Sequence, residues 1–568
     1  EGRIVDMLSA DPCAVRHGSA LTKYILGGFV LFCVSWIACV SEWHAGLRWR
    51  DGSSASARSS YSTMPTIVAY SAGKQAEMDK PSPVSCEQLP AFPTIPYINR
   101  TWVRGDQQQG WLSWQQVPGT GVSLYAAYYD QRLPQHYIRI LAIFDGRSYS
   151  NADQLFCQTR PQNPYEISVE VVAAKPTEIW WPGWDTNSLN VETPLLLSCP
   201  LTEPLTGPSI VSIVTQPCDY PTNAFYLEPT KYKSNERNFT VCVKDMKFEN
   251  DISTELIEWI ETNKILGADK IDIYVDHISD EVADVIEYYR NNNFVRILQV
   301  PINSQERPLW QRRRDHIITY NDCLYRNIHE SHYIIPLDVD EILLPKVANN
   351  LHHLVLRLKE YGWNPTINSA ILVRNVFFFD FMQGIDKYKY NNLHNNKTKI
   401  YVKRDDVRLE DFDQIELVVD NDLGDNNNVH NVNNEVIDFK NEKLIEEYKN
   451  RCGSDIPVPR LARHLVRSNV ISPFGHYSKS LMLTKNVLTA FNHYPLASLG
   501  MSGFSGWAAP FSEVQLNHYK ESCNTTVVSE CARYGRRARI DSSALKLRRR
   551  LTQALALGPC TKHKIKGT

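Results

Sequence analysis

The strongest chemical signal in the sequence is Asp338-Val339-Asp340-Glu341, which directly follows an apolar run, Tyr333–Leu337. The run reads as a buried strand that ends where the acidic residues begin. Side chains two apart on an extended strand point to the same side, so Asp338 and Asp340 should face together while Glu341 turns away. Two carboxylates at a strand end suit Mg²⁺ or Mn²⁺ carrying a diphosphate. The alternative is a solvated acidic turn that binds nothing.

The elements before this cluster are expected to place it at one edge of a sheet. Apolar runs at 239–244, 271–276 and 294–300 read as further buried strands. Periodic apolar residues predict helices that begin near Asp251 and Ser279, and a longer helix before the fourth strand. Alternating strands and helices build a parallel sheet, and ligands bind beyond the carboxyl ends of its strands. We therefore predict an α/β fold with a mainly parallel sheet flanked by helices.

Length and composition exclude several classes of protein. A chain of 568 residues suggests about 2–4 domains or subdomains. The hydrophobic fraction of 43% and the charged fraction of 22% exclude a wholly disordered protein. Lysine and arginine number 61 against 63 acidic residues, a net charge of −2, so no global basic field points to nucleic acid. We expect no nucleic-acid partner.

The first eighty-five residues predict a membrane-anchored protein. Tyr24–Val40 is a stretch of seventeen residues without a charge, at the short end of what spans a bilayer. We interpret 24–40 as an uncleaved transmembrane signal-anchor, 1–23 as a cytoplasmic tail and 41–85 as a flexible stem rich in serine and alanine. A cleaved signal peptide and a buried core helix are the alternatives. The layout is that of a single-pass type II membrane protein whose large body is lumenal.

Cysteines and glycosylation sequons agree with a lumenal body. Ten cysteines follow the predicted anchor, with no C-x-x-C pair, so a zinc knuckle is not expected. In an oxidising lumen they allow up to five disulfides, whose pairing the sequence does not give. Four N-x-S/T sequons also follow the anchor: Asn99, Asn238, Asn396 and Asn524.

The body is expected to have two parts. Residues 86–235 contain short strand-like runs separated by Pro, Gly and Asn clusters, as in a smaller β-rich module. Residues 236–530 carry the strand–helix alternation. An Asn-rich stretch within about 386–442 predicts a disordered insertion, and 531–568 reads as a basic C-terminal tail. Tryptophans of the β-rich module suit packing better than a sugar-binding platform: Trp111, Trp114, Trp180, Trp181 and Trp184.

Several short motifs, taken in order, resemble glycosyltransferase family 92. They are C-V-K-D (Cys242–Asp245), Y-N-D-C-L (Tyr320–Leu324), I-P-L-D-V-D-E-I-L-L-P (Ile335–Pro345), G-H-Y-S-K-S (Gly475–Ser480), F-N-H-Y-P-L (Phe491–Leu496) and L-N-H-Y-K (Leu516–Lys520). The resemblance implies a GT-A-like fold, a metal ion (Mn²⁺ or Mg²⁺), Golgi residence and inverting transfer from a nucleotide sugar. It further implies a galactosyltransferase that uses UDP-galactose, with a glycan or glycoprotein acceptor such as the core fucose of N-glycans.

The resemblance also suggests roles for individual residues. Asp338 and Asp340 match the family's D-x-D motif and would hold the metal and the donor. A later histidine completes the metal site in many GT-A enzymes, and His493 is the first candidate and His518 the second. Lys479 is a candidate for the donor diphosphate; a surface lysine is the alternative.

Other donor contacts and the general base are less well marked. Asp276, at the end of the second strand, is a candidate for uridine or ribose, with helix capping as the alternative. Inversion needs a base that takes the proton of the acceptor hydroxyl. Asp380 and Glu513 are candidates for this base, and the sequence does not choose between them.

Two other functions remain open at this stage. A glycosidase would use paired carboxylates about 5–9.5 Å apart and would need no metal. A lectin-like protein would keep the fold and bind glycan without catalysis. The adjacent placement of Asp338 and Asp340 favours a metal-dependent transferase over the glycosidase, and the intact D-x-D argues against the lectin.

Overall fold

The computed structural model describes residues 82–88, 90–105, 114–149, 154–163, 165, 168–229, 237–302, 307–383, 399–400, 415–417, 442–475, 477–500, 506–523 and 531–560. The chain divides into two units, Glu1–Val68 and Ala69–Thr568, and all described residues belong to the second. The predicted tail and anchor lie outside the described residues, as do nearly all of the stem and of the 386–442 insertion. Among the described helices, none has the length and apolar character needed to cross a bilayer.

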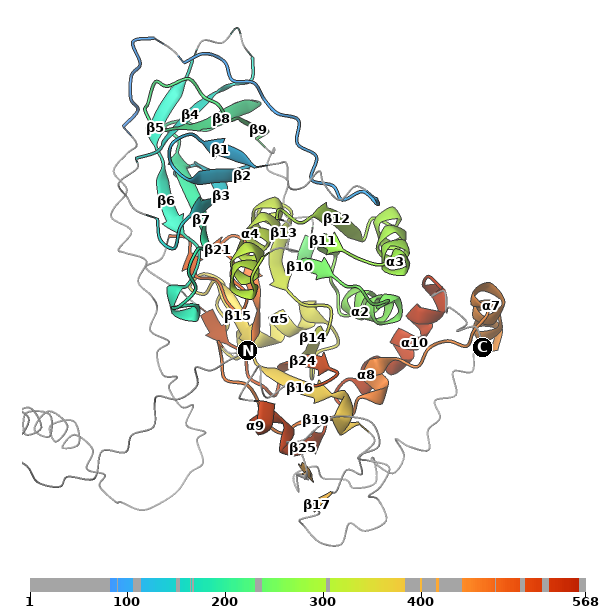
Figure 1. Ribbon diagram of the computed structural model, residues 1–568. Coiled ribbons are helices and arrows are strands. Elements are labelled where there is room, and N and C mark those ends of the chain that lie inside the picture. Colours follow the sequence, from blue (N-terminus) through green and yellow to red (C-terminus); the bar gives the residue numbers. More distant parts are fainter. Residues whose placement is uncertain are drawn as a thin grey trace, which may run out of the picture. The chain divides into compact units, whose positions relative to one another are not determined.

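Residues 115–227 form two antiparallel sheets (Figure 1). A five-stranded sheet has the order β1-β2-β3-β7-β6, and a four-stranded sheet the order β5-β4-β8-β9. Their shared core includes Leu124, Ile140 and Leu197, and a disulfide joins Cys157 of β4 to Cys199 of β7. The elements are β1 (Gln115–Val117), β2 (Val122–Asp130), β3 (Tyr137–Asp145), β4 (Phe156–Pro161), β5 (Glu170–Ala173), β6 (Lys175–Glu178), the 3₁₀ turn η2 (Pro182–Trp184), β7 (Glu192–Pro200), β8 (Ser209–Val214) and β9 (Phe225–Leu227).

The predicted alternation of strands and helices after residue 236 is confirmed. The elements are β10 (Arg237–Lys247), α2 (Ser253–Ile265), β11 (Lys270–His277), α3 (Asp280–Asn291), β12 (Val295–Gln299), α4 (Leu309–Asn327) and β13 (Ser331–Pro336). Ser279 caps α3 by accepting the backbone N–H of Val282. Alternate residues of β10 face opposite sides, so Val241 and Val243 pack with α2 and α3 while Cys242 packs with α4.

The sheet that these strands form is mixed. Its order is β12-β11-β10-β13-β20-β15-β23, and the first four strands are parallel. β20 (Lys479–Leu483) is antiparallel to both of its neighbours, β13 and β15 (Ala370–Val373). β23 (Gly506–Ala508) closes the far edge parallel to β15. The prediction of a mainly parallel sheet is therefore correct for β12, β11, β10 and β13 only. The antiparallel strand β20, which begins at Lys479, was not predicted from the sequence.

A second, three-stranded sheet adjoins the carboxyl end of β13. It has the order β14-β24-β16, formed by β14 (Glu341–Pro345), β24 (Val514–Lys520) and β16 (Asn375–Phe379). β14 is antiparallel to β24, and β16 is parallel to it. The helix α5 (Leu351–Glu360) follows β14. This sheet brings two distant parts of the sequence, β24 and β16, to the strand that begins in the D-V-D-E segment.

The remaining described elements all follow β16 in the sequence. They are η3 (Asp380–Met382), β17 (Lys399–Ile400), β18 (Ile415–Leu417), α7 (Glu442–Cys452), α8 (Arg460–Arg463), β19 (Val466–Ser468), β21 (Val487–Thr489), β22 (Ala497–Ser498), α9 (Cys531–Gly535), β25 (Arg537–Ile540), η5 (Leu545–Leu547) and α10 (Arg548–Leu557). β25 pairs with β18 and β19. Figure 1 shows α10 close to α2 and α7.

The C-terminal segment 531–568 was expected to be a basic tail, and its structure up to residue 560 differs. Leu547, Leu551 and Leu555 are buried in the same core as α2, and a disulfide joins Cys452 to Cys560. Arg548, Arg549 and Arg550 lie on the more exposed side of the amphipathic helix α10. The prediction of a tail was wrong because it considered only the number of charges.

The body cysteines are largely paired, in agreement with the predicted disulfides. Besides the two already named, disulfides join Cys86 to Cys218 and Cys242 to Cys323. Cys523 is also disulfide-bonded. The Cys242–Cys323 bridge connects β10 to α4 in the interior of the α/β region, because both cysteines are almost fully buried.

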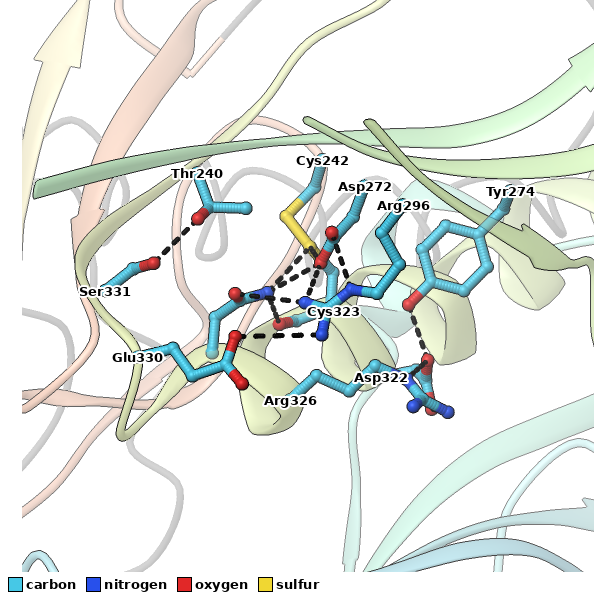
Figure 2. The surroundings of a disulfide bond; sticks show 11 residues. Thr240, Cys242, Asp272, Tyr274, Arg296, Asp322, Cys323, Arg326, Glu330 and Ser331 are labelled. Atoms are coloured by element: carbon cyan, nitrogen blue, oxygen red, sulfur yellow. Dashed lines mark hydrogen bonds and ion pairs between the residues drawn. A yellow bond between two sulfur atoms is a disulfide. The ribbon is translucent and has the colours of Figure 1, made fainter. Parts of the chain in front are cut away.

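Figure 2 shows that charged pairs surround this bridge. Asp272 of β11 accepts from both Nε and one terminal nitrogen of Arg296, at 2.8 and 2.6 Å. Asp322 of α4 accepts from Arg326 at 2.6 Å and also from the hydroxyl of Tyr274. Both aspartates have an exposed fraction of 0%. Disulfide and ion pairs together fix α4 against the parallel strands.

Candidate active site

The D-V-D-E segment forms a tight turn between β13 and β14 rather than the end of an extended strand. The backbone N–H of Glu341 donates to the carbonyl of Asp338, at 3.0 Å. The N–H of Asp338 in turn donates to the carboxylate of Glu341, also at 3.0 Å. The expectation that Glu341 turns away was therefore wrong, because the turn brings its carboxylate back to the two aspartates. As predicted, the turn lies at the carboxyl end of a parallel strand.

Two lysines contact the carboxylate of Asp338. Lys244, near the carboxyl end of β10, lies 2.8 Å from one oxygen, and Lys479, at the start of β20, lies 3.4 Å from the other. Burial alone would raise the pKa of Asp338, but these two cations hold it well below its usual value. The side chain of Asp338 is still 27% exposed, so a ligand can approach it.

Asp340 is held from the other side, by β24. Nε2 of His518 lies 3.2 Å from one carboxylate oxygen, and Nζ of Lys520 lies 3.2 Å from the same oxygen. The backbone N–H of Tyr519 donates to the carbonyl of Asp340, at 2.8 Å, which fixes the turn against the strand. Although burial would raise it, the pKa of Asp340 is lowered, chiefly by His518 and Lys520.

Glu341 connects these two halves. Its carboxylate lies 3.3 Å from Nζ of Lys479 and 3.6 Å from Nδ1 of His518. Burial raises the pKa of Glu341, and Lys479 only partly opposes this effect. Nδ1 of His518 is buried and makes no hydrogen bond within the described part of the chain.

Lys479, predicted to contact a diphosphate, is almost fully buried, with 1% of its surface exposed. Its Nζ donates to the side-chain oxygen of Asn492 at 2.9 Å, and the hydroxyl of Tyr320 donates to the same oxygen at 3.1 Å. Asp338 and Glu341 raise its pKa against the opposing effect of burial. Lys479 thus holds the acidic turn in place, and the more exposed Lys244 and Lys520 are better placed to meet a ligand.

His493, the first metal candidate, makes no direct contact with Asp338 or Asp340 in the described structure. Its Nδ1 lies 2.7 Å from the carbonyl oxygen of Ser478. Burial and the nearby Lys479 lower its pKa to about 3, so the imidazole is neutral at physiological pH. Of the two predicted histidines, the structure brings only His518 to the aspartates.

The predicted nucleoside residue Asp276 lies in a hollow of about 300 Å³ beyond the carboxyl ends of β10, β11 and β12. Asp245, which follows Lys244 in the sequence, lines the same hollow and pairs with His316 at 2.8 Å and Arg312 at 3.1 Å. The full lining is Asp245, Asp276, Val300, Pro301, Ile302, Arg312, Asp315, His316 and Thr319. The lysine that holds Asp338 is therefore adjacent in the sequence to a residue that lines this hollow.

Of the two base candidates, Asp380 lies on the side of the site where Asp340 is. It follows Phe379 at the end of β16, and Phe379 pairs with Lys520. Its carboxylate accepts from His464 at 2.7 Å and from Arg460 at 2.8 Å. These hydrogen bonds lower its pKa against the opposing effect of partial burial. Arg460 also lines a second hollow, of about 350 Å³, together with Asp340.

Glu513, the other base candidate, lies at the opposite end of the three-stranded sheet. It precedes Val514, which pairs with Pro345 at the far end of β14 from Glu341. Its carboxylate is bound by Arg357 at 2.9 Å and by the hydroxyl of Tyr361, also at 2.9 Å. The structure therefore does not bring Glu513 to the acidic turn, and its contacts are those of an ion pair that anchors α5.

The residues of the turn offer the chemistry that a divalent cation needs. Asp338, Asp340 and Nε2 of His518 are hard oxygen and imidazole donors, and the carboxylate of Glu341 behind the buried Nδ1 is the outer partner such a histidine ligand commonly has. In the described residues, no group of three or more His, Cys, Asp or Glu side chains is already arranged around a metal position. Lysines instead neutralise the aspartates.

Three residues of this cluster were not predicted from the sequence as site residues: Lys244, Glu341 and Lys520. Signals for two of them existed. Lys244 lies at the end of a predicted strand beside the one that carries Asp338, and Lys520 is two residues from His518 on the same strand face. Glu341 could not have been found in this way, because its role depends on the turn.

The comparisons with known proteins agree with the geometry. The sequence profile of glycosyltransferase family 92 matches residues 237–547, which is more than half of the chain. The chain belongs to glycosyltransferase family 92. The family's region covers β10 through η5 and so includes both sheets that build the acidic turn.

This family 92 chain also resembles individual proteins over shorter stretches. It is 25% identical over 146 residues to a protein named beta-1,4-galactosyltransferase galt-1 from Caenorhabditis elegans, a match that covers 25% of this chain and 32% of that relative. The matched part thus spans about a third of the relative's length. Among solved structures, S. aureus TarS 1–349, alone and in complex with UDP-GlcNAc, is 15% identical over 25% of this chain and 36% or 35% of TarS, with a TM-score of 0.18.

Proposed function

We propose that the protein is a metal-dependent, inverting glycosyltransferase of GT-A type that transfers galactose from UDP-galactose to a glycan acceptor, such as the core fucose of N-glycans. The observation that carries the proposal is the turn Asp338–Glu341 at the carboxyl end of β13, where two partly exposed aspartates meet His518 and two accessible lysines. Family membership and the similarity to a protein named as a galactosyltransferase support the choice of reaction and sugar.

The donor would lie across the carboxyl ends of the parallel strands. The hollow that contains Asp276 and Asp245 would take the nucleoside, and Lys244, next to Asp245, would face the diphosphate. Asp338, Asp340 and His518 would hold Mn²⁺ or Mg²⁺. When bound, the cation supplies Lewis-acid stabilisation of the negative charge that develops on the leaving diphosphate. Lys244 and Lys520 add fixed positive charge on either side of the turn.

Asp380 is the base that the geometry favours. Its lowered pKa keeps the carboxylate ionised at neutral pH, so that it can accept the proton of the attacking hydroxyl. His464 and Arg460 hold it in one orientation, and Arg460 connects it to the hollow that Asp340 lines. That hollow, with Trp259 and Tyr519 in its lining, is where we place the acceptor side of the reaction.

The cellular setting is proposed from the sequence. The uncharged segment 24–40, the stem and the sequons support a single-pass type II protein of the Golgi membrane with a lumenal body. The disulfides agree with an oxidising compartment.

A donor screen tests the function. Residues 74–568 are secreted without the anchor and incubated with UDP-galactose, UDP-glucose, UDP-GlcNAc or GDP-fucose, with and without a fucosylated N-glycan, in Mn²⁺ or in chelator. We expect acceptor-dependent release of UDP from UDP-galactose that chelator abolishes. The control is Glu513→Gln, a carboxylate variant away from the turn, which should release UDP like the wild type.

The same assay separates the alternatives. A lectin-like protein would bind the glycan without releasing UDP from any donor. A glycosidase would release a sugar from the glycan without a nucleotide and in the presence of chelator. Acceptor-dependent transfer that is insensitive to chelator would leave a glycosyltransferase whose leaving group is stabilised by Lys244 and Lys520 alone, and the metal would have to be withdrawn.

A further inference from the structure

The β-rich module contacts the α/β region close to the proposed active site. Its 3₁₀ turn η2 (Pro182–Trp184) places Trp184 against the loop that follows β21. The ring of Trp184 lies 4.7 Å from that of Phe491 and 5.3 Å from that of His493, measured between centroids, and Trp180 lies 5.8 Å from Phe491. Trp184 and His493 are both only partly buried.

The loop that Trp184 touches is directly connected to the acidic turn. Asn492, between the two aromatic residues, accepts from Nζ of Lys479 at 2.9 Å, and Lys479 lies 3.4 Å from Asp338. One residue of the β-rich module is therefore separated from the proposed donor and metal site by a single loop.

The hydrogen bond of His493 fixes which of its nitrogens carries a proton. The carbonyl oxygen of Ser478 can only accept, so Nδ1 of His493 must be the donor in their 2.7 Å contact. A neutral imidazole with its proton on Nδ1 has a lone pair on Nε2. The residue before Ser478 has an unusual backbone conformation, since Tyr477 has a φ of 53°.

Trp184 and His493 thus combine an aromatic face with a hydrogen-bond acceptor and no net charge. Such a combination does not suit a diphosphate, which needs cations, and it does suit a neutral polyhydroxylated ring. The apolar face of a pyranose can lie against an indole while one of its hydroxyls donates to an imidazole nitrogen. The nearby cations, Lys479 and Lys244, are already bound to Asn492 and Asp338.

We propose that Trp184 of the β-rich module and His493 form a binding site for the pyranose ring of a sugar, with Nε2 of His493 accepting from a ring hydroxyl. The proposal rests on the proposed function, because it assigns a ligand at the same site. The ring is that of the donor sugar or that of the terminal acceptor sugar, which have the same chemistry here. In either case the β-rich module is part of the active site.

Steady-state kinetics of residues 74–568 distinguish the two sources. Trp184→Ala and His493→Ala should each raise one KM at least tenfold, that of the nucleotide sugar or that of the acceptor, and leave the dissociation constant of UDP within twofold. A change in the donor KM assigns the site to the donor sugar, and a change in the acceptor KM assigns it to the acceptor. Trp181→Ala is the matched control, since Trp181 is on the same turn and makes no ring contact with His493 among the described residues.

Three results would overturn the proposal: unchanged KM values in both variants, an equal loss of UDP binding, or a Trp181→Ala variant that behaves like Trp184→Ala. Should Trp184→Ala not fold, Trp184→Phe, which keeps a ring of smaller area, is expected to raise the same KM two- to fivefold. Binding of methyl β-galactoside, followed by saturation-transfer NMR on the wild type and His493→Ala, needs no turnover. It therefore tests the sugar site even if the chain proves not to be a transferase.

Discussion

Two clusters of charge lie beside the same strand, β10, and they are built differently. Around Cys242 the aspartates are fully buried, and each is bound by an arginine that uses two nitrogens: Asp272 by Arg296 and Asp322 by Arg326 (Figure 2). Two residues further along, Lys244 contacts Asp338 of the acidic turn, whose two aspartates are about a third exposed. Neighbouring cations lower the pKa values of Asp322, Asp338 and Asp340 against the opposing effect of burial.

The difference lies in whether the partner can be exchanged. A guanidinium that binds a buried carboxylate at two points leaves no room for a ligand, and breaking such a pair is costly. A lysine is a mobile point charge on a flexible stem, and a partly exposed lysine–aspartate pair contributes little to stability. The first cluster is therefore suited to hold the fold, and the second to exchange its cations for a ligand.

Removing one carboxylate from each cluster gives the largest contrast. Asp322→Ala leaves Arg326 buried without its partner and deprives Tyr274 and Tyr128 of an acceptor. We expect a loss of about 3–5 kcal/mol in the free energy of unfolding, measured by urea denaturation of residues 74–568. The matched variant Asp340→Ala should lose less than about 1 kcal/mol. Equal losses in the two variants would contradict the distinction between the clusters.

The second prediction concerns activity at the exchangeable cluster. Asp340→Asn keeps the size of the side chain and removes its charge, so the fold should survive while a metal ligand is weakened. Transfer from UDP-galactose should fall at least ~100-fold, equivalent to about 2.7 kcal/mol of transition-state stabilisation. Excess Mn²⁺ should restore little. A folded Asp340→Asn protein with nearly full, chelator-insensitive transfer would remove the metal from the mechanism.

These clusters also show which features of the fold and the site can be predicted from the sequence. Local patterns predicted the four parallel strands, the helices between them and the position of Asp338 and Asp340, because strand and helix periods and the strand-end rule are local or depend on sequential neighbours. Local sequence patterns could not predict that His518, and not His493, contacts the aspartates. This contact depends on the pairing of β14 with β24, residues that are some 170 positions apart in the sequence, and no period in either strand indicates that pairing.

Turn geometry and packing account for the other differences. Glu341 was expected to face away because the segment was read as extended, and a turn of two residues reverses that orientation. The C-terminal helix α10 was hidden by its arginines, although Leu551 and Leu555 are spaced one turn apart and bury against α2. Glu513 resembles a base in the sequence, and only the structure shows that Arg357 binds its carboxylate.

The buried carboxylate of Asp315 belongs to neither cluster, and it predicts that stability depends on pH. It lines the hollow that contains Asp276, and burial raises its pKa to about 7, because Arg307 and Gln311 compensate only in part. The folded protein then binds a proton that the unfolded chain has released above about pH 4. Stability is therefore expected to fall as the pH rises from about 4 through 7.

Asp315→Asn should remove this dependence. At pH 8 the variant should be more stable than the wild type by about 1–2 kcal/mol, less than the ~4 kcal/mol of three full pKa units, because Arg307 and solvent relieve part of the burial. At pH 5 the difference should be no more than about a third of that at pH 8, because only the interval from about pH 4 to 5 then contributes. Thermal denaturation at both values is the measurement, with Asp276→Asn as a control from the same hollow. A stability difference that is the same at pH 5 and pH 8 would contradict the assignment.

The smallest expected effect tests whether a lysine at the acidic turn occupies a cation position. Nζ of Lys520 lies 3.2 Å from the oxygen of Asp340 that His518 also contacts, and its side chain is 41% exposed. Lys520→Met removes a charge that competes with a divalent ion for this oxygen, so the Mn²⁺ concentration for half-maximal transfer should fall about two- to fivefold, which is less than 1 kcal/mol. The free energy of unfolding should change by no more than about 0.5 kcal/mol.

Lys443→Met, on the exposed face of α7, is the control, with 86% of its side chain exposed. If the Mn²⁺ requirement rises instead, Lys520 orients Asp340 for the ion, and the pair is as fixed as the arginine pairs around Cys242. If only the donor KM rises, Lys520 binds phosphate and does not occupy a cation position.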